Sequence, residues 1–144
     1  MTNSLPLRNV DRRVALLAAA LFVLLGASHA AVGQETDQSV RLIVDYGDGT
    51  AKTVSALAWA KGNTVLDAMK AATARPHGIS FSYTGSGDSA VLTKIDDVQN
   101  EGGGAGKKNW RYLVNATYGD RSFAAFELQA GDIVVWRFVT EQGK

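Results

Sequence analysis

Two aromatic-rich strands near the C-terminus constrain the fold of this chain more than any other feature. In the first strand, Trp110, Tyr112 and Val114 occupy every second position. Because successive side chains of a strand point to opposite faces, these three form one apolar row. The second strand covers residues 133–139, is apolar on both faces and follows a turn at Ala130-Gly131-Asp132. We therefore expect a β-sheet with a packed aromatic face.

The first 30 residues have the composition of a secretory signal peptide. Arginines at 8, 12 and 13 precede an apolar run over 14–26, and Ser28-His29-Ala30 offers the small residues that a signal peptidase reads. The apolar run is shorter than the roughly 20 residues of a membrane-spanning helix. We expect cleavage after Ala30 rather than an uncleaved anchor, then a short disordered lead over 31–39. The mature protein is expected to be exported, periplasmic or extracellular, with no stable membrane span.

The remaining composition excludes several classes of function. Without residues 1–30, 12 of the 15 basic and 13 of the 14 acidic side chains remain. This balance gives no electrostatic footprint for nucleic acid. The chain has no cysteine, which excludes disulfides, a thiol nucleophile and a cysteine zinc site. Its length suits one domain with a core of its own.

Hydrophobic periodicity from residue 40 onward predicts strands, one helix and then further strands. Strands are expected over 40–46 and 52–59, joined by a hairpin turn at Gly47-Asp48-Gly49. Thr64 and Asp67 form a capping-box-like pair, and Arg75-Pro76 is a stop, so we expect a helix over 64–74. Short strands over 79–83 and 90–95 and a flexible glycine-rich loop over 100–108 precede the aromatic strands. This order resembles a β-grasp, an α+β fold in which a mixed sheet packs on one main helix.

No set of residues assembles into a catalytic centre, so we expect a protein that is not an enzyme. The glycine-rich loop lacks the residue pattern of a P-loop, and His77 has no second histidine with which to share a transition metal. Asp45 and Asp48 fit a hairpin turn better than a Ca²⁺ loop. Asp96-Asp97 are sequence neighbours, so on a strand they would point to opposite faces and could not share a proton as a catalytic pair does.

The aromatic residues are the remaining candidates for a binding surface. Trp136 and Phe138 are expected in the core, because aromatic rings stabilise sheets and fill small cores. Trp110 and Tyr112 lie next to the glycine-rich loop and fit the core and a ligand surface equally well. Asn115 is expected to begin the turn after the first aromatic strand, where asparagine tolerates left-handed backbone.

Trp110-x-Tyr112-x-Val114-Asn115 followed by Gly131-Asp132-x-Val134-x-Trp136 resembles the small β domain that ends transcobalamin and intrinsic factor. Weaker similarity at 64–68 and 94–98 extends the resemblance to about residues 40–140. It implies an exported binding module for a flat, largely apolar ligand, with a cobalamin-like corrinoid as the candidate and no covalently bound cofactor. The ligand contacts are then expected at Trp110, Tyr112, Asn115, Gly103 and Gly104.

Two departures from that family leave a second hypothesis open. Ala116 stands where the family usually has glycine, and the α-barrel that supplies most cobalamin contacts in the transcobalamins is missing. The alternative is a protein-interaction or envelope-structural module. Its open sheet edge and its aromatic residues Trp110 and Tyr112 would bind an exported partner protein.

Overall fold

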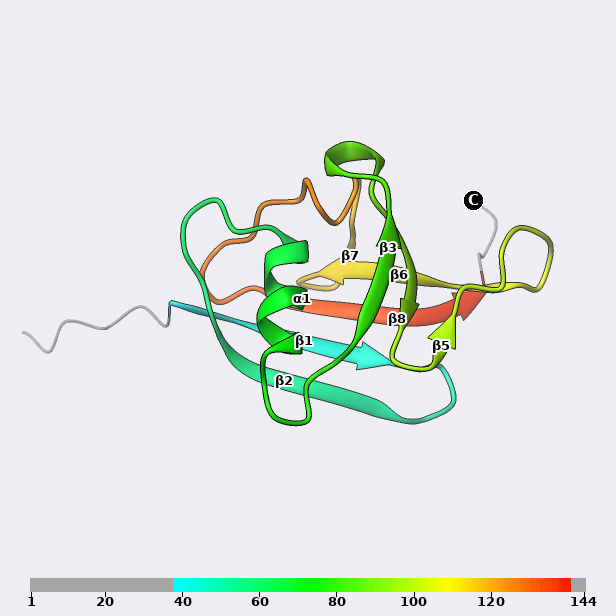
Figure 1. Ribbon diagram of the computed structural model, residues 1–144, viewed down its shortest axis with the longest axis horizontal. Helices are drawn as coiled ribbons and strands as arrows, with labels where there is room; N and C mark the ends of the chain where they lie inside the picture. The colour runs from blue at the N-terminus through cyan, green and yellow to red at the C-terminus, as the bar shows by residue number, and fades with distance from the viewer. Residues whose placement is uncertain (1–37, 141–144) are drawn as a thin grey trace, which may run out of the picture. The chain divides into compact units, whose positions relative to one another are not determined.

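The computed structural model describes residues 38–140, which form two β-sheets and one α-helix (Figure 1). The main sheet has five strands in the order β2-β1-β8-β6-β7. These strands are β1 (Ser39–Asp45), β2 (Ala51–Ala58), β6 (Lys108–Val114), β7 (Thr117–Tyr118) and β8 (Ile133–Thr140).

The main sheet is mixed, because its last strand runs parallel to its first. In the β1–β8 pair Val44 lies opposite Trp136, and in the antiparallel β6–β8 pair Tyr112 lies opposite the same tryptophan. Antiparallel pairing joins β1 to β2 and β6 to β7. Trp136 therefore sits in the middle of a row of inward side chains that crosses three strands.

The helix α1 (Val65–Thr73) begins where the Thr64 and Asp67 pattern predicted. The Thr64 hydroxyl accepts a hydrogen bond from the Asp67 backbone N–H, and the Asp67 carboxylate accepts one from the Thr64 backbone N–H. This reciprocal pair satisfies two of the donors that a helix start leaves unpaired. Val65, Met69 and Ala72 are fully buried and join a core that includes Leu42, Val44, Val134 and Trp136.

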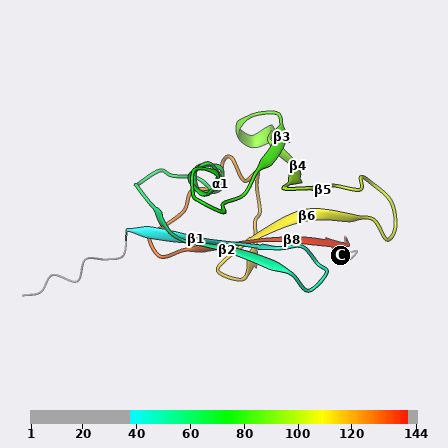
Figure 2. The same cartoon turned by 60° about the horizontal axis from the view of Figure 1, so that its bottom comes forward.

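The second sheet is small and antiparallel, in the order β3-β4-β5. Its strands are β3 (Phe81–Thr84), β4 (Val91–Ile95) and β5 (Val98–Gln99), and a 3₁₀ turn, η1 (Gly87–Ser89), joins β3 to β4. Figure 2 shows α1 and this small sheet on the same side of the main sheet. Among the described residues, no helix or strand covers the opposite face.

The sequence predicted the mixed sheet and the single helix correctly, and it missed the division into two sheets. The argument that Asp96 and Asp97 cannot pair assumed strand geometry, but both residues lie in the turn between β4 and β5, where Asp96 has a φ of 47°. A short aspartate can adopt this left-handed conformation. The signal peptide expected over 1–30 lies outside the described residues, so cleavage and export stay predictions.

Candidate functional site

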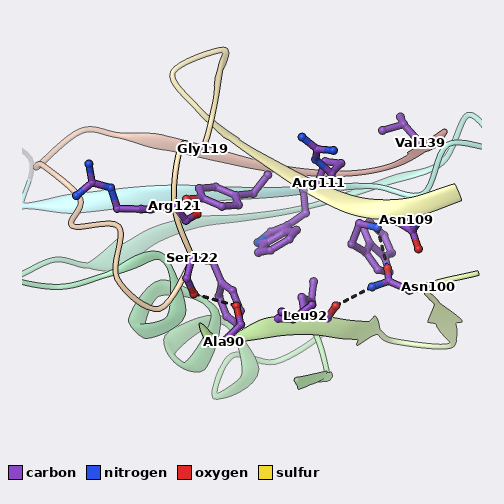
Figure 3. Close-up of a pocket in the computed structure, with 14 residues that line it drawn as sticks. Ala90, Leu92, Asn100, Asn109, Arg111, Gly119, Arg121, Ser122 and Val139 are labelled. Atoms are coloured by element: carbon purple, nitrogen blue, oxygen red, sulfur yellow. Dashed lines mark hydrogen bonds between the residues drawn. The ribbon is translucent and has the colours of Figure 1, made fainter. Parts of the chain in front are cut away.

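A pocket of about 400 Å³ lies between strand β4 of the small sheet and strand β6 of the main sheet. Figure 3 shows Ala90 and Leu92 on one side of it and the β6 ribbon on the other. The segment 119–123 closes one end, and Asn100 lies at the other. We call this the inter-sheet pocket.

Aromatic side chains form most of the apolar wall of the inter-sheet pocket. Trp110 and Tyr112 come from β6, Trp136 from β8 and Phe123 from the segment that follows β7. The Trp136 ring lies 5.3 Å from the Tyr112 ring and 5.5 Å from the Phe123 ring between centroids, and the Phe123 contact is edge-to-face. Such contacts favour particular orientations of the rings and contribute to the packing of the wall.

Trp110 and Tyr112, the two aromatics predicted to touch a ligand, belong to the core and line the pocket as well. Their exposed fractions are 5% and 8%. The Trp110 indole N–H donates to the Val98 carbonyl at 2.9 Å, and the Tyr112 hydroxyl donates to the Arg121 carbonyl at 2.7 Å. Both rings thus connect β6 to other parts of the pocket wall instead of forming an exposed aromatic platform.

Most polar side chains that line the inter-sheet pocket already have protein partners. The Asn100 amide donates to the Leu92 carbonyl, and its oxygen accepts from the Trp110 backbone N–H. The Ser122 hydroxyl donates to the Ala90 carbonyl at 2.9 Å, so it ties the 119–123 segment to the small sheet (Figure 3). The Asn109 amide is bonded to the Gly102 backbone. These bonds stabilise the wall and occupy polar atoms of Asn100, Ser122 and Asn109; the lining also includes Arg111 and Arg121.

Trp136 is the exception. Its side chain lines the pocket, its exposed fraction is 2%, and its indole Nε1 has no hydrogen-bond partner among the described residues. A buried donor without an acceptor costs about 1–3 kcal/mol. Trp136 Nε1 is therefore a buried hydrogen-bond donor for which residues 38–140 provide no acceptor.

The Tyr112 ring also limits the shape of the pocket at Gly119. A β-carbon at Gly119 would lie within 2.3 Å of three Tyr112 ring and hydroxyl atoms. Only glycine therefore allows the segment to pass this close. Burial, followed by the charge of Asp120, raises the pKa of Tyr112 to about 12, so its hydroxyl is a donor and not a base near neutral pH.

The other predicted ligand residues lie away from the inter-sheet pocket. Gly103 and Gly104 are exposed in the loop between β5 and β6 and are not among the lining residues. Asn115 lies in the β6–β7 turn with a φ of 49°, as predicted for a left-handed turn residue, and its side chain bonds Asp132 and the Ile133 backbone. The structure thus brings together two of the five predicted residues.

A second polar cluster, which sequence reasoning missed, joins the two sheets on the side of β1 and β2. The Asp96 carboxylate accepts hydrogen bonds from the Tyr46 hydroxyl, from Lys52 Nζ at 2.9 Å and from the Ser80 backbone N–H at 2.8 Å. Burial alone would raise the pKa of Asp96, but these hydrogen bonds outweigh it and lower the pKa below its usual range. We call this the Asp96 cluster; its contacts link residues that follow or belong to β1 and β2 with the turn between β4 and β5.

The described residues contain neither a metal cluster nor a membrane-spanning helix. Within residues 38–140, no three His, Asp or Glu side chains gather closely enough to hold a metal ion. The helix of this region is too short and too polar to cross a bilayer.

The sheet edge that the alternative hypothesis invokes is irregular. β2 is the longer edge strand, but its pairing with β1 shifts register between Val40 and Leu42. Ala56, in the same part of β2, has a φ of 52°, and its carbonyl accepts a hydrogen bond from Arg75. Such an irregularity disfavours the addition of a further strand there.

Comparison with known proteins identifies a similar fold but no family. The sequence matches no protein-family model and no curated protein. A crystal structure from Ruminococcus gnavus, of a protein proposed to bind a metal, is similar with a TM-score of 0.56 and 12% sequence identity. The similarity covers 74% of this chain and 99% of that one. At this identity the match supports the fold alone.

Proposed function

We propose that this protein is an exported, non-catalytic binding module whose inter-sheet pocket takes a flat, largely apolar ligand. The main support for this proposal is the unpaired Nε1 of Trp136, a residue that lines the pocket together with other aromatic rings. Apolar pockets with a few convergent polar groups are typical small-molecule sites. The proposed metal of the Ruminococcus gnavus protein finds no matching cluster among residues 38–140.

The pattern of satisfied and unsatisfied groups limits the chemistry of the ligand. Asn100, Asn109, Ser122 and Tyr112 already use their polar atoms in protein hydrogen bonds. The ligand therefore gains most from an apolar, aromatic-sized body with one acceptor oxygen, such as a carbonyl, placed near Trp136. The acceptor would relieve the cost of the buried donor and orient the ligand.

The resemblance to the transcobalamin domain suggests a corrinoid as the candidate ligand. The assignment of the fold as a β-grasp rests on the same resemblance and is part of this proposal. The pocket, at about 400 Å³, lies toward the small end of the roughly 300–1,000 Å³ range of ligand sites. A corrinoid would therefore lie across its mouth and place only one edge or side group inside. A smaller fused-ring compound would enter completely.

Binding assays with four compounds test the proposal. Cobalamin and cobinamide probe the corrinoid hypothesis by tryptophan fluorescence after inner-filter correction. Coumarin, a flat compound with a carbonyl acceptor, and naphthalene, which has none, probe the pocket by equilibrium dialysis. We expect coumarin to bind saturably to the wild-type protein and about tenfold more weakly to Trp136→Phe, which keeps an aromatic ring and removes the donor.

Trp59→Phe is the matched control. The Trp59 indole N–H donates to the Leu128 carbonyl, and Trp59 does not line the pocket. This variant should bind coumarin as the wild type does. If none of the four compounds binds at high micromolar concentration, or if both variants lose the same affinity, the proposal is wrong.

A further inference from the structure

The Nε1 atom of Trp136 is buried as well as unpaired among the described residues. Trp136 is 2% exposed, although its side chain lines the inter-sheet pocket. A hydrogen bond to Nε1 needs an acceptor within about 3.2 Å, and an atom that water does not reach is closed to a larger ligand as well. In this arrangement the ligand cannot place its acceptor against Nε1, so part of the pocket wall must move before the bond forms.

The strands on either side of Trp136 are unsuited to such a movement. In the main sheet Trp136 lies between Val44 of β1 and Tyr112 of β6, and both strands pair with β8 before and after that position. A movement of either strand would break several backbone hydrogen bonds of its ladder together. The sheet therefore holds Trp136 and these two neighbours in place.

Phe123 contacts Trp136 without the support of such a ladder. Its ring meets the Trp136 ring edge-to-face, with 5.5 Å between the centroids. Phe123 belongs to the 119–123 segment, which follows β7 and is part of no helix or strand. Segments of this kind open locally more readily than the strands of a core. Displacement of the Phe123 ring therefore breaks fewer bonds than a movement of β1 or β6.

The backbone of Phe123 is anchored, whereas its ring reaches a residue at the surface. Its carbonyl accepts a hydrogen bond at 3.1 Å from the backbone N–H of Leu66, in the first turn of α1. Its ring meets the Tyr83 ring edge-to-face at 5.7 Å, and Tyr83 is 38% exposed. Phe123 thus links the buried Trp136 to an exposed tyrosine, while its own backbone is fixed to α1.

A side-chain hydrogen bond closes the 119–123 segment onto the small sheet. The Ser122 hydroxyl donates to the Ala90 carbonyl at 2.9 Å (Figure 3). The same hydroxyl oxygen accepts from the Ala124 N–H at 3.3 Å. Because Ser122 directly precedes Phe123, this bond limits how far the ring and its segment can move away from β4. Its loss should therefore favour an open form of the pocket.

We propose that Phe123 is a gate over Trp136 and that the hydrogen bond from Ser122 to Ala90 holds this gate closed. In the open form the Phe123 ring leaves Trp136, a ring of the ligand takes its place, and the acceptor of the ligand bonds Nε1. The open form is a minor state that the ligand makes dominant, because only there does Nε1 gain an acceptor. This inference rests on the proposed function and adds the conformational step that binding requires.

Hydrogen–deuterium exchange of the three indole N–H groups, followed by NMR, tests the gate in the full chain without any ligand. The Trp136 N–H has no acceptor among the described residues and is protected by burial, so its exchange reports how often the gate opens. Ser122→Ala should accelerate this exchange about fivefold, the factor that the loss of one hydrogen bond corresponds to. Phe123→Leu, which removes the ring contact, should accelerate it as well. The N–H groups of Trp59 and Trp110, which donate to backbone carbonyls, should exchange as in the wild type.

Ser89→Ala is the matched control for Ser122→Ala. The Ser89 hydroxyl also donates to a backbone carbonyl at 2.9 Å, that of Ser86, and its oxygen also accepts from a backbone N–H. Ser89 lies in the exposed η1 turn and does not line the inter-sheet pocket. This variant should leave the exchange of the Trp136 N–H unchanged.

Coumarin binding, measured by equilibrium dialysis, provides a second readout. Ser122→Ala should bind coumarin about fivefold more tightly than the wild type, because less of the binding free energy is needed to open the gate. Ser89→Ala should bind it as the wild type does. A fixed wall in which Ser122 only contacts the ligand predicts the opposite direction for Ser122→Ala.

Three outcomes would overturn the gate. The first is unchanged exchange at Trp136 in both Ser122→Ala and Phe123→Leu, even where coumarin binds the wild type. The second is equal acceleration at all three indoles, which would show a general loss of stability. The third is a coumarin affinity of Ser122→Ala that equals or falls below that of the wild type. Selective acceleration at Trp136 in a protein that binds none of the four compounds would support the gate and show that the proposed function is wrong.

Discussion

Replacement of Asp96 by asparagine should destabilise the protein by about 2–3 kcal/mol, because the Asp96 cluster holds the two sheets together. Asparagine retains the acceptor for the Ser80 backbone N–H and tolerates the left-handed backbone of this position, so the turn itself survives. Its Nδ2 cannot accept from Tyr46 or Lys52. The change therefore removes two charge-assisted contacts and little else.

The magnitude follows from the two lost contacts. A hydrogen bond to a charged group contributes about 1.5–3 kcal/mol, which applies to the half-buried Tyr46 hydroxyl. The Lys52 side chain is 35% exposed, so its ion pair counts at the surface value of about 0–1 kcal/mol. Urea unfolding of the wild type, Asp96→Asn, Tyr46→Phe and the double variant gives the coupling of the pair. We expect a coupling free energy of about 1–2 kcal/mol.

The pH dependence provides an internal check. Because hydrogen bonds lower the pKa of Asp96 in the folded state, its stabilisation is complete above the ordinary aspartate pKa of about 3.9 and is lost as the pH falls further. The difference in stability between the wild type and Asp96→Asn should therefore shrink below that pH. A coupling near zero, or a difference that is independent of pH down to acid unfolding, would refute the role of the Asp96 cluster.

Three further predictions concern the helix, the core and the pocket tyrosine. Thr64→Ala removes the capping hydroxyl and should lower the free energy of unfolding by about 1 kcal/mol in urea, whereas Lys61→Ala in the preceding exposed turn should not. Trp136→Ala should cost about 3–5 kcal/mol, and a loss below 1 kcal/mol would show that Trp136 is not a core residue. Because burial raises the pKa of Tyr112 to about 12, the stability that it contributes is complete below pH 10 and is lost between about pH 10 and 12. Tyr112→Phe should flatten the alkaline loss over that range, and an unchanged profile would contradict the assignment.

Local rules predicted the parts of the fold that depend on short stretches of sequence. The capping pair of Thr64 and Asp67 placed the helix start, because both hydrogen bonds form within four residues. The glycines at 47 and 49 predicted the β1–β2 hairpin, and both have positive φ. The Trp110, Tyr112 and Val114 alternation predicted the inward row of β6, since a strand repeats every two residues.

The division into two sheets could not be predicted in the same way, because it depends on contacts far apart in the sequence. Asp96 meets Tyr46 across 50 positions, and Ser122 meets the Ala90 carbonyl across 32. Hydrophobic periodicity along the sequence does not indicate which distant residues form such pairs. The same reason explains why two of the five expected ligand residues line the pocket, while the segment 119–123, which carries no motif, forms one of its walls.

Strand β8 shows a different limit of sequence reasoning. A strand that is apolar on both sides, such as residues 133–139, indicates burial on both faces. Among residues 38–140, helices and strands cover only the side of β8 that carries Trp136, whereas Val135 alternates with it and points to the other side. Hydrophobic periodicity alone therefore does not show which elements of the chain cover each face of such a strand.

The indole N–H resonances of the three tryptophans report directly on ligand binding in the inter-sheet pocket. Trp110 and Trp136 line the inter-sheet pocket, and Trp59 lies outside it with its N–H bonded to Leu128, so it serves as an internal reference. In a ¹⁵N-labelled sample titrated with coumarin or cobinamide, we expect a saturable shift of the Trp136 resonance, a smaller one of Trp110 and none of Trp59. A titration in which Trp136 does not move, or in which all three resonances move together, would contradict a binding function for this pocket.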